Sequence, residues 1–358
     1  MPFREKLPSI LIYLTTITVL IIIVLFIGLQ RFIQYFTELD FLGIFSLFLL
    51  LLLLYVADML IRTYRWQILL AVQGVKLPIK ALALPVVSAL TINLFTIARA
   101  GETIRMYALK RNYETKYSDT LSSIVIEQVL SIGGLLFVIT GSLLLIGSSL
   151  LQIENSEIIL QLVVIIFLIS VICLIILSLM MLNPEVFEKF LRLFPLIIEK
   201  RLISAYQAFQ TGIKGLRERP FHLALGIATS ASIWIIEGIM IYVIAITVFP
   251  ILKPIDFPWV IAASCAGNIT FIIPILPGAI GQYEFVLALV LVNSPNYPNQ
   301  DAVLIAVLDR LAKSIMLGVF GGYATLRLGG KEVIRLRKDI ISDSEKTNEG
   351  IYEKDNHT

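Results

Sequence analysis

Charged and glycine residues interrupt the apolar sequence at two places and could bind an anion there. The first group consists of Asn93, Arg99, Gly101, Glu102 and Arg105. Arginine forms paired hydrogen bonds with phosphate oxygens, and an ionised side chain deep in a bilayer costs roughly 2.5 to 3.5 kcal/mol on insertion scales. We therefore expect these charges to contact a headgroup, an ion or a partner charge.

The second group lies in the last third of the chain, and two isolated carboxylates lie in apolar stretches before it. The carboxylates are Glu127 and Glu237, and the second group consists of Gly278, Gly281, Tyr283, Glu284, Asp309 and Arg310. The glycines of both groups would let backbone N–H groups approach an anion. All of these are candidate substrate-binding residues, and they suggest no catalytic, metal or cofactor site.

The composition predicts an integral membrane protein, so these residues must act from within a bilayer. Of the 358 residues, 58% are hydrophobic and 15% are charged, and the mean hydropathy is +0.88. Apolar stretches of about 20 residues cross a hydrocarbon core of roughly 30 Å. We predict an all-α, polytopic helical bundle with six full spans, at residues 10–29, 41–61, 121–146, 158–182, 221–249 and 302–326.

Two shorter apolar segments, residues 81–98 and 259–276, are predicted to be re-entrant or broken. Basic residues flank the first on both sides, whereas the loops around the second contain almost none. Because basic loops face the cytoplasm, the first segment enters from inside, and the second enters from outside and returns through residues 285–293. Both termini are then cytoplasmic, in a multi-pass protein of the cell membrane.

The chain divides into two membrane halves that could form an inverted repeat. We assign residues 1–182 to the first half, 183–220 to a cytoplasmic amphipathic connector, 221–330 to the second half and 331–358 to a polar tail. The connector suits either a helix lying on the inner membrane surface or one packed under the bundle. Broken segments at matching places in inverted halves predict a substrate site near the midplane.

Other charged residues and the two cysteines have simpler explanations in the sequence. Arg62 and Arg65, at the end of the second predicted span, are explained by snorkelling and by an Asp58–Arg62 pair one helical turn apart. Asp309 could pair locally with Lys313. Cys173 and Cys265 are expected to act as small hydrophobic residues.

The residues named above, with a few neighbours, resemble the membrane half of lysylphosphatidylglycerol synthases over roughly residues 10–330. The resemblance is to a free-standing member of that family without the aminoacyl-transferase domain. It is carried by Arg65, Trp66, Leu69, Leu70, Asn93, Arg99, Gly101, Glu102, Arg105, Glu127, Pro277, Gly278, Gly281, Glu284 and Arg310. One departure is that the family's Glu-Arg-x-x-Asp pattern is represented here by Glu127, Gln128 and Ser131.

The resemblance implies lipid translocation between leaflets. Arg99 and Arg105 would pair with a phosphate, and Glu102 and Glu127 would orient these arginines or bind a headgroup amine. Tyr283, Glu284 and Arg310 would form a corresponding outer station. The expected partners are membrane lipids with anionic headgroups.

Three functions remain open at this point. The first is a flippase or scramblase for an anionic phospholipid or lipid-linked headgroup. The second is a proton-coupled transporter of a small solute, and the third is a non-transporting partner of a lipid-modifying enzyme or glycosyltransferase. No nucleotide-binding loop is visible, and we expect neither an enzyme nor a nucleic-acid-binding protein. The sequence leaves a homo-oligomer open.

Overall fold

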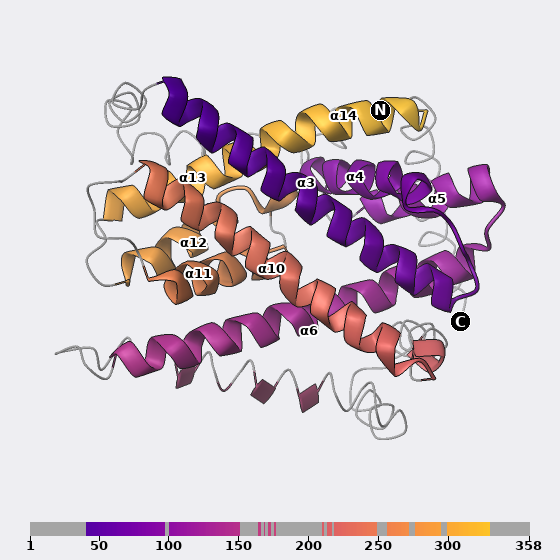
Figure 1. Cartoon of the computed structure of the whole chain (residues 1–358), viewed down its shortest axis with the longest axis horizontal. Helices are drawn as coiled ribbons and strands as arrows, with labels where there is room; N and C mark the ends of the chain where they lie inside the picture. Colours follow the sequence, from indigo (N-terminus) through magenta and orange to yellow (C-terminus); the bar gives the residue numbers. More distant parts are fainter. Residues whose placement is uncertain are drawn as a thin grey trace, which may run out of the picture.

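The computed structural model describes most of the two predicted membrane halves. The described residues are 41–96, 100–150, 164–165, 168, 171–172, 175–176, 210, 213–216, 218–248, 256–271, 276–294 and 299–329. Within these ranges the ordered elements are helices and there is no strand (Figure 1). The predicted all-α fold is therefore confirmed for this part of the chain. The predicted span at 10–29 and most of the span at 158–182 lie outside it.

In the part of the chain that the structure describes, three helices are long and apolar enough to cross a membrane. They are α3 (Phe41–Val72), α6 (Tyr117–Leu150) and α10 (Pro220–Val248), and they confirm the segments predicted at 41–61, 121–146 and 221–249 as long apolar helices. The end predicted for the first of them was wrong, because α3 continues past residue 61. The apolar residues Leu69 and Leu70 are fully buried and extend the helix beyond the two arginines. Arg62 and Arg65 therefore lie inside α3 rather than at its end.

The region predicted as the last span is helical but interrupted. It consists of α13 (Asn299–Met316), a π-helical turn η2 (Leu317–Gly321) and α14 (Gly322–Arg327). A π-turn places one extra residue in the helical turn and widens it. The turn packs against α4 so closely that a Cβ atom on Gly321 would lie 1.5 Å from the Thr91 hydroxyl oxygen. Glycine is therefore required at this contact.

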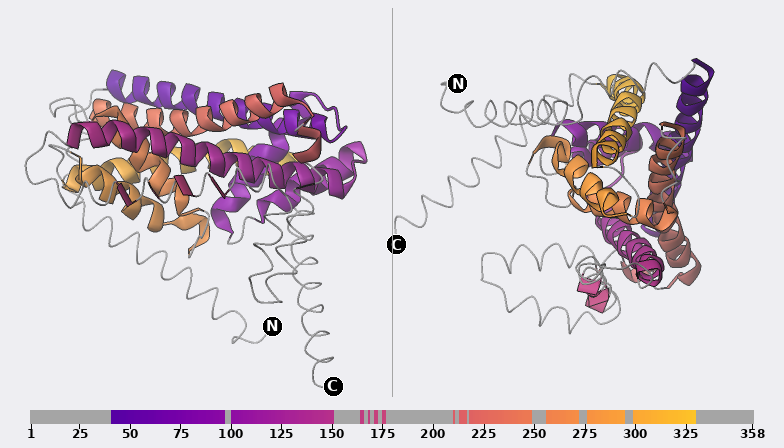
Figure 2. Two further views of the ribbon diagram at one scale, coloured as in Figure 1. Left: turned by 90° about the horizontal axis from the view of Figure 1, so that it is seen from below. Right: turned by 90° about the vertical axis from the view of Figure 1, so that its left-hand side faces the viewer.

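The two shorter apolar segments form helix pairs at opposite ends of the molecule. The first pair is α4 (Ile79–Phe95) with α5 (Gly101–Tyr113), and the second is α11 (Phe257–Ile269) with α12 (Gln282–Val292). In Figure 1, α4 and α5 lie towards one end of the long axis, whereas α11 and α12 lie towards the other. The left view of Figure 2 shows α3, α6 and α10 running along the molecule.

The two pairs approach each other at their tips. Between α11 and α12 the short 3₁₀ turn η1 (Pro277–Ala279) contains Gly278 in the left-handed region, with φ of 60°. A Cβ atom on Gly278 would lie 2.4 Å from the Leu94 carbonyl oxygen near the end of α4. Only glycine fits both this conformation and this contact, so the two interruptions of the apolar sequence meet in space.

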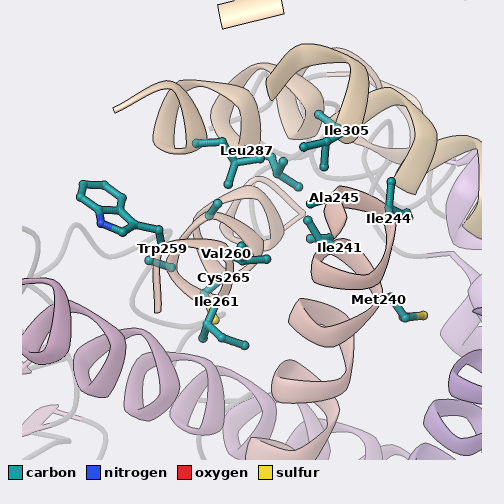
Figure 3. Packing of buried hydrophobic residues seen from close by; sticks show 14 of the residues in the cluster. Met240, Ile241, Ile244, Ala245, Trp259, Val260, Ile261, Cys265, Leu287 and Ile305 are labelled. Atoms are coloured by element: carbon teal, nitrogen blue, oxygen red, sulfur yellow. The ribbon is translucent and has the colours of Figure 1, made fainter. Parts of the chain in front are cut away.

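The main apolar core lies between α10 and the second helix pair. Ile241, Val260, Leu287 and Ile305 are fully buried there and come from α10, α11, α12 and α13 (Figure 3). Cys265 is buried in the same cluster and is not in a disulfide, which confirms its role as a small hydrophobic residue. Cys173 lies outside the described residues. The core fixes α10 and α13, which carry several of the charged residues described below.

A short part of the predicted connector packs against the bundle. Ile213 and Leu216 are fully buried and form an apolar cluster with Leu69 of α3 and with Ile126 and Leu130 of α6. For these residues the alternative of a helix packed under the bundle is favoured over one lying free on the membrane surface.

Two adjacent glycines of α6 give a test of the helix packing. A Cβ atom on Gly134 would lie 2.7 Å from the Ser230 Cβ and 2.9 Å from its carbonyl carbon in α10, whereas one on Gly133 would meet nothing within 4 Å. We expect Gly134→Ala to lower the free energy of unfolding by about 1–3 kcal/mol because a helix backbone cannot move aside cheaply. Gly133→Ala is the matched control and should be neutral or slightly stabilising. Thermal unfolding in detergent measures both, and equal effects would contradict the α6–α10 contact.

Candidate functional site: a cavity lined by paired charges

A cavity of about 210 Å³ lies between α3, α4, α6, α10, α13 and the turn η1. Its wall contains five cationic and four anionic side chains as well as apolar and aromatic residues. The charged residues are Asp58, Arg62, Arg65, Glu102, Arg105, Glu127, Glu237, Arg310 and Lys313. They come from both halves of the sequence, so the cavity exists only once the halves have assembled.

Glu127 of α6 holds the first group of charges together. One of its carboxylate oxygens accepts a hydrogen bond from Arg65 of α3 at 3.0 Å, and the other accepts one from Arg105 of α5 at 2.7 Å. All three residues are at most 5% exposed. Arg65 also donates to the Ser230 hydroxyl of α10 at 3.0 Å. A single carboxylate thus links the first helix pair to the long helices.

An aromatic ring completes the surroundings of Arg105. Its guanidinium lies over the Trp66 ring at 4.0 Å from the ring centre, and the Trp66 indole donates to the Ser123 hydroxyl at 3.1 Å. A guanidinium is weakly hydrated and stacks favourably on aromatic faces. Arg105 is therefore held in one orientation, with Glu102 on one side at 2.9 Å and Glu127 on the other.

Asn93 fixes the start of α5 against the end of α4. Its side-chain oxygen accepts the backbone N–H of Gly101 at 2.8 Å, and its amide nitrogen lies 3.5 Å from a Glu102 oxygen. The absence of a side chain at Gly101 allows this approach, because a Cβ atom there would lie 2.0 Å from the Ala89 carbonyl oxygen. The first predicted group thus forms the tight corner that presents Glu102 and Arg105 to the cavity.

Five further charged residues form a chain of ion pairs across α3, α10 and α13, called here the ion-pair chain. Arg62 pairs with Asp58 at 2.7 Å and with Glu237 at 2.9 Å, and Lys313 pairs with the other oxygen of Glu237. Lys313 also pairs with Asp309 at 3.0 Å. The order is therefore Asp58, Arg62, Glu237, Lys313 and Asp309. The predicted local pairs Asp58–Arg62 and Asp309–Lys313 are both confirmed.

Arg310 joins the second helix pair to the same cavity. It donates to the Gly278 carbonyl, lies 3.5 Å from Glu284, and stands over the rings of Phe271 and Tyr283 at 5.3 and 5.7 Å from their centres. The Tyr283 hydroxyl in turn donates to Asp309 at 2.6 Å. Arg310 of α13 thus resembles Arg105 of α5, since each arginine lies over an aromatic ring and pairs with a glutamate.

The structure brings nearly all the predicted site residues to one place. Asn93, Glu102, Arg105, Glu127, Glu237, Gly278, Tyr283 and Arg310 line the cavity. Glu284 and Asp309 lie directly behind it as partners of Arg310 and Lys313. Arg99 lies outside the described residues.

Two glycines do not have the role expected from the sequence. The Gly101 N–H donates to Asn93, and the Gly281 N–H donates to Glu284 at 2.7 Å. Neither N–H is therefore open to an anion in this structure. Gly281, with φ of 82°, instead begins α12, where Glu284 satisfies its N–H group.

Sequence reasoning missed the contribution of α3. Asp58, Arg62 and Arg65 were explained as features of a span end, yet all three line the cavity. The spacing of these residues, three or four apart, places them on one helical face. The apolar residues that follow Arg65 were the signal that the helix continues and that this charged face lies inside the protein.

The donor set favours organic ions over a resident metal. Among the described residues there is no group of three or more His, Cys, Asp or Glu side chains that could hold a metal ion. The carboxylates are instead paired with arginine and lysine. Such groups bind phosphates through the cations and amines through the carboxylates.

The fold and this cavity define the class: an α-helical membrane protein with a paired ionic cluster in its interior. The chain belongs to the family described as lysylphosphatidylglycerol synthase TM region, whose match covers residues 10–321. The membership predicted from the sequence is thereby confirmed, and it links the protein with lipid metabolism. No curated protein gives a significant match to the chain.

The bridging position of Glu127 makes a prediction about stability. Removing one partner of a buried ion pair leaves the other charge uncompensated and costs about 3–5 kcal/mol. We expect Glu127→Gln to lower the free energy of unfolding by this amount because two buried arginines lose their shared anion. Glu102→Gln is the control, since the Glu102 side chain is 17% exposed and pairs with one arginine. Denaturant unfolding in detergent compares the two, and equal losses would show that Glu127 is not the central link.

Proposed function

We propose that this protein moves an anionic phospholipid or a lipid-linked anionic headgroup between the leaflets of the cell membrane. The observation that carries the proposal is the cavity, in which five cations lie among buried side chains. Membership of a family linked with lipid metabolism supports a lipid over a soluble ion as the substrate.

The size of the cavity favours entry of a headgroup alone. Its volume of about 210 Å³ is smaller than the roughly 300–1,000 Å³ typical of sites for drug-sized ligands. The outward faces of the long helices carry exposed apolar residues such as Leu42, Phe45 and Leu53 on α3. We infer that acyl chains remain against such faces in the bilayer while the headgroup passes through the interior.

The paired charges offer a mechanism that avoids any unpaired ion. A phosphate entering the cavity would replace a carboxylate at an arginine, so that the arginine stays neutralised throughout. Arg105 is suited to this exchange because Trp66 and Glu102 keep its guanidinium in place when Glu127 is displaced. A displaced carboxylate could then accept an amine or a neighbouring cation.

We extend the proposal to the arrangement of the chain in the membrane. We propose a multi-pass protein with both termini in the cytoplasm, and the distribution of basic residues supports this orientation. The α4–α5 and α11–α12 pairs are proposed to be re-entrant segments of an inverted repeat. Their positions at opposite ends of the molecule support this reading (Figure 1). We propose no catalytic step for this chain, and membrane lipids are its expected partners.

Leaflet exchange in proteoliposomes tests the proposed function. Purified protein is reconstituted with labelled anionic, zwitterionic or polyprenyl-phosphate lipids, and exchange is followed by quenching of the label in the outer leaflet. We expect Arg105→Ala to reduce exchange of anionic lipids by about 10-fold to 100-fold. That range corresponds to the roughly 1.5–3 kcal/mol of a hydrogen bond to a charged group.

Lys110→Ala is the matched control for this experiment. Lys110 lies on the same helix as Arg105 but is exposed, so its removal should leave exchange unchanged. Equal exchange in all three proteins would contradict a role for the cavity. The absence of exchange for every lipid, with a working control scramblase, would instead favour a solute transporter or a non-transporting partner.

A further inference from the structure

We infer that Asp58 is a proton-binding site of the cavity and that one proton accompanies each anionic headgroup. Only the second part, that one proton accompanies each headgroup, rests on the proposed function. The first part, the proton site itself, follows from the ion-pair chain on α3, α10 and α13.

The ion-pair chain contains one more carboxylate than it contains cations. Asp58, Glu237 and Asp309 alternate with Arg62 and Lys313. The remaining ion pairs are balanced in charge. Glu102 and Glu127 pair with Arg65 and Arg105, and Glu284 pairs with Arg310. Among the described ion pairs, the excess negative charge therefore lies in the ion-pair chain of Asp58, Glu237 and Asp309, where an uncompensated buried charge is costly.

The carboxylate oxygens of the ion-pair chain that lack a hydrogen-bond partner in the described structure lie at its two ends. Both oxygens of the central Glu237 are engaged, by Arg62 and by Lys313. Asp58 and Asp309 each have one buried oxygen, Oδ1, without a hydrogen-bond partner among the described residues. An extra proton is thus best accommodated on one of these two terminal carboxylates.

Asp58 is the end that the cavity can reach. Its side chain lines the cavity, whereas Asp309 lies behind the wall and accepts a further hydrogen bond from Tyr283. Tyr55, one helical turn before Asp58, also lines the cavity, and its buried hydroxyl has no partner among the described residues. Asp58 and Tyr55 are 1% and 3% exposed, so each places one unsatisfied buried oxygen in a residue that lines the cavity.

The charged groups around Asp58 come from all the helices packed against it. Arg62 and Arg65 follow it on α3, Glu237 faces it from α10 and Lys313 from α13. Glu127 of α6 lies beyond Arg65 and is occupied by the two arginines of the first group. Among the described residues, the only direct counter-ion of Asp58 is therefore Arg62, which it shares with Glu237.

A proton fits this position better than a metal cation does. One carboxylate oxygen and one phenol oxygen are too few for hard cations, which take about six or more oxygen ligands. The described residues also provide no acidic or histidine cluster for a metal. A proton needs only the one free oxygen of Asp58.

Headgroup binding would link this site to transport. A phosphate that pairs with Arg62 removes the single ion pair of Asp58, and the carboxylate then takes a proton from the aqueous phase to become a neutral acid. When the phosphate leaves, Arg62 returns and the proton is released. The step forms and breaks one O–H bond, involves no oxidation, and moves no net charge for a headgroup of charge −1.

Infrared spectroscopy of the purified protein tests the proton site without any transport. We expect a carbonyl band of a protonated carboxylic acid that titrates with pH and grows when a short-chain anionic phospholipid is added. The band should be absent in Asp58→Asn, an uncharged side chain of the same shape. A band that persists unchanged in Asp58→Asn, or no such band in the native protein, would overturn the assignment.

A lipid distribution measurement tests the coupling. With the membrane potential clamped at zero, a gradient of one pH unit should drive a tenfold excess of anionic lipid into the leaflet facing the more alkaline side, because one proton moves together with each headgroup in the same direction. Asp58→Asn should abolish the excess. Asp256→Asn is the matched control, since Asp256 is exposed at the start of α11, and it should retain the excess.

The two measurements separate the failure of this inference from that of the proposed function. Lipid exchange without any response to the pH gradient would overturn proton coupling and leave the flippase proposal intact. A titrating band that depends on Asp58, in a protein that exchanges no lipid, would support the proton site and overturn the flippase proposal together with the coupling.

Discussion

The structure depends on the requirement that charges buried between apolar helices be paired. Glu127 meets this requirement for two arginines at once, and the chain from Asp58 to Asp309 meets it across three helices. Because an ion pair needs both partners at hydrogen-bond distance, these contacts fix the relative positions of α3, α5, α6, α10 and α13. In the proposed function the same requirement would let an incoming phosphate replace a carboxylate, because the cations are already held and oriented and the exchange would leave each of them neutralised.

Close backbone contacts create the space in which the charges face one another. The corner at Gly101 lets α5 lie against α4, and Gly278 lets the turn of the second helix pair touch the end of α4. Arg105 and Arg310 have parallel surroundings, each with a glutamate and an aromatic ring. Arg105 of α5 and Arg310 of α13 thus present similar cationic groups to one cavity, and the second helix pair supplies Glu284 and Tyr283 as partners of Arg310.

The sequence predicted the all-α fold, the three long apolar helices and five of the nine charged residues that line the cavity, because interrupted hydropathy and buried charges are local signals. It predicted the local pairs Asp58–Arg62 and Asp309–Lys313, but it could not predict which charges pair between helices. The contacts Arg65–Glu127 and Arg62–Glu237 join residues that are 62 and 175 positions apart, and only helix packing brings them together. The assignment of Arg62 and Arg65 to a span end failed because a hydropathy pattern ends at the first charge, whereas a helix with a charged inner face continues. The roles of Gly101 and Gly281 also depend on contacts with Asn93 and Glu284, which only the folded chain shows.

Movement of a headgroup between leaflets requires that the cavity be reached from both sides of the membrane, and cysteine accessibility tests this requirement most directly. Ser131 lines the cavity, and Ser131→Cys in a Cys173→Ala background places one reactive thiol there. The native Cys265 is fully buried and serves as an unreactive internal reference. From the proposed lipid translocation we predict that a membrane-impermeant thiol reagent labels this cysteine from either side of the membrane, and that a short-chain anionic phospholipid slows the labelling. Labelling from one side only, or labelling that anionic lipid does not affect, would contradict it.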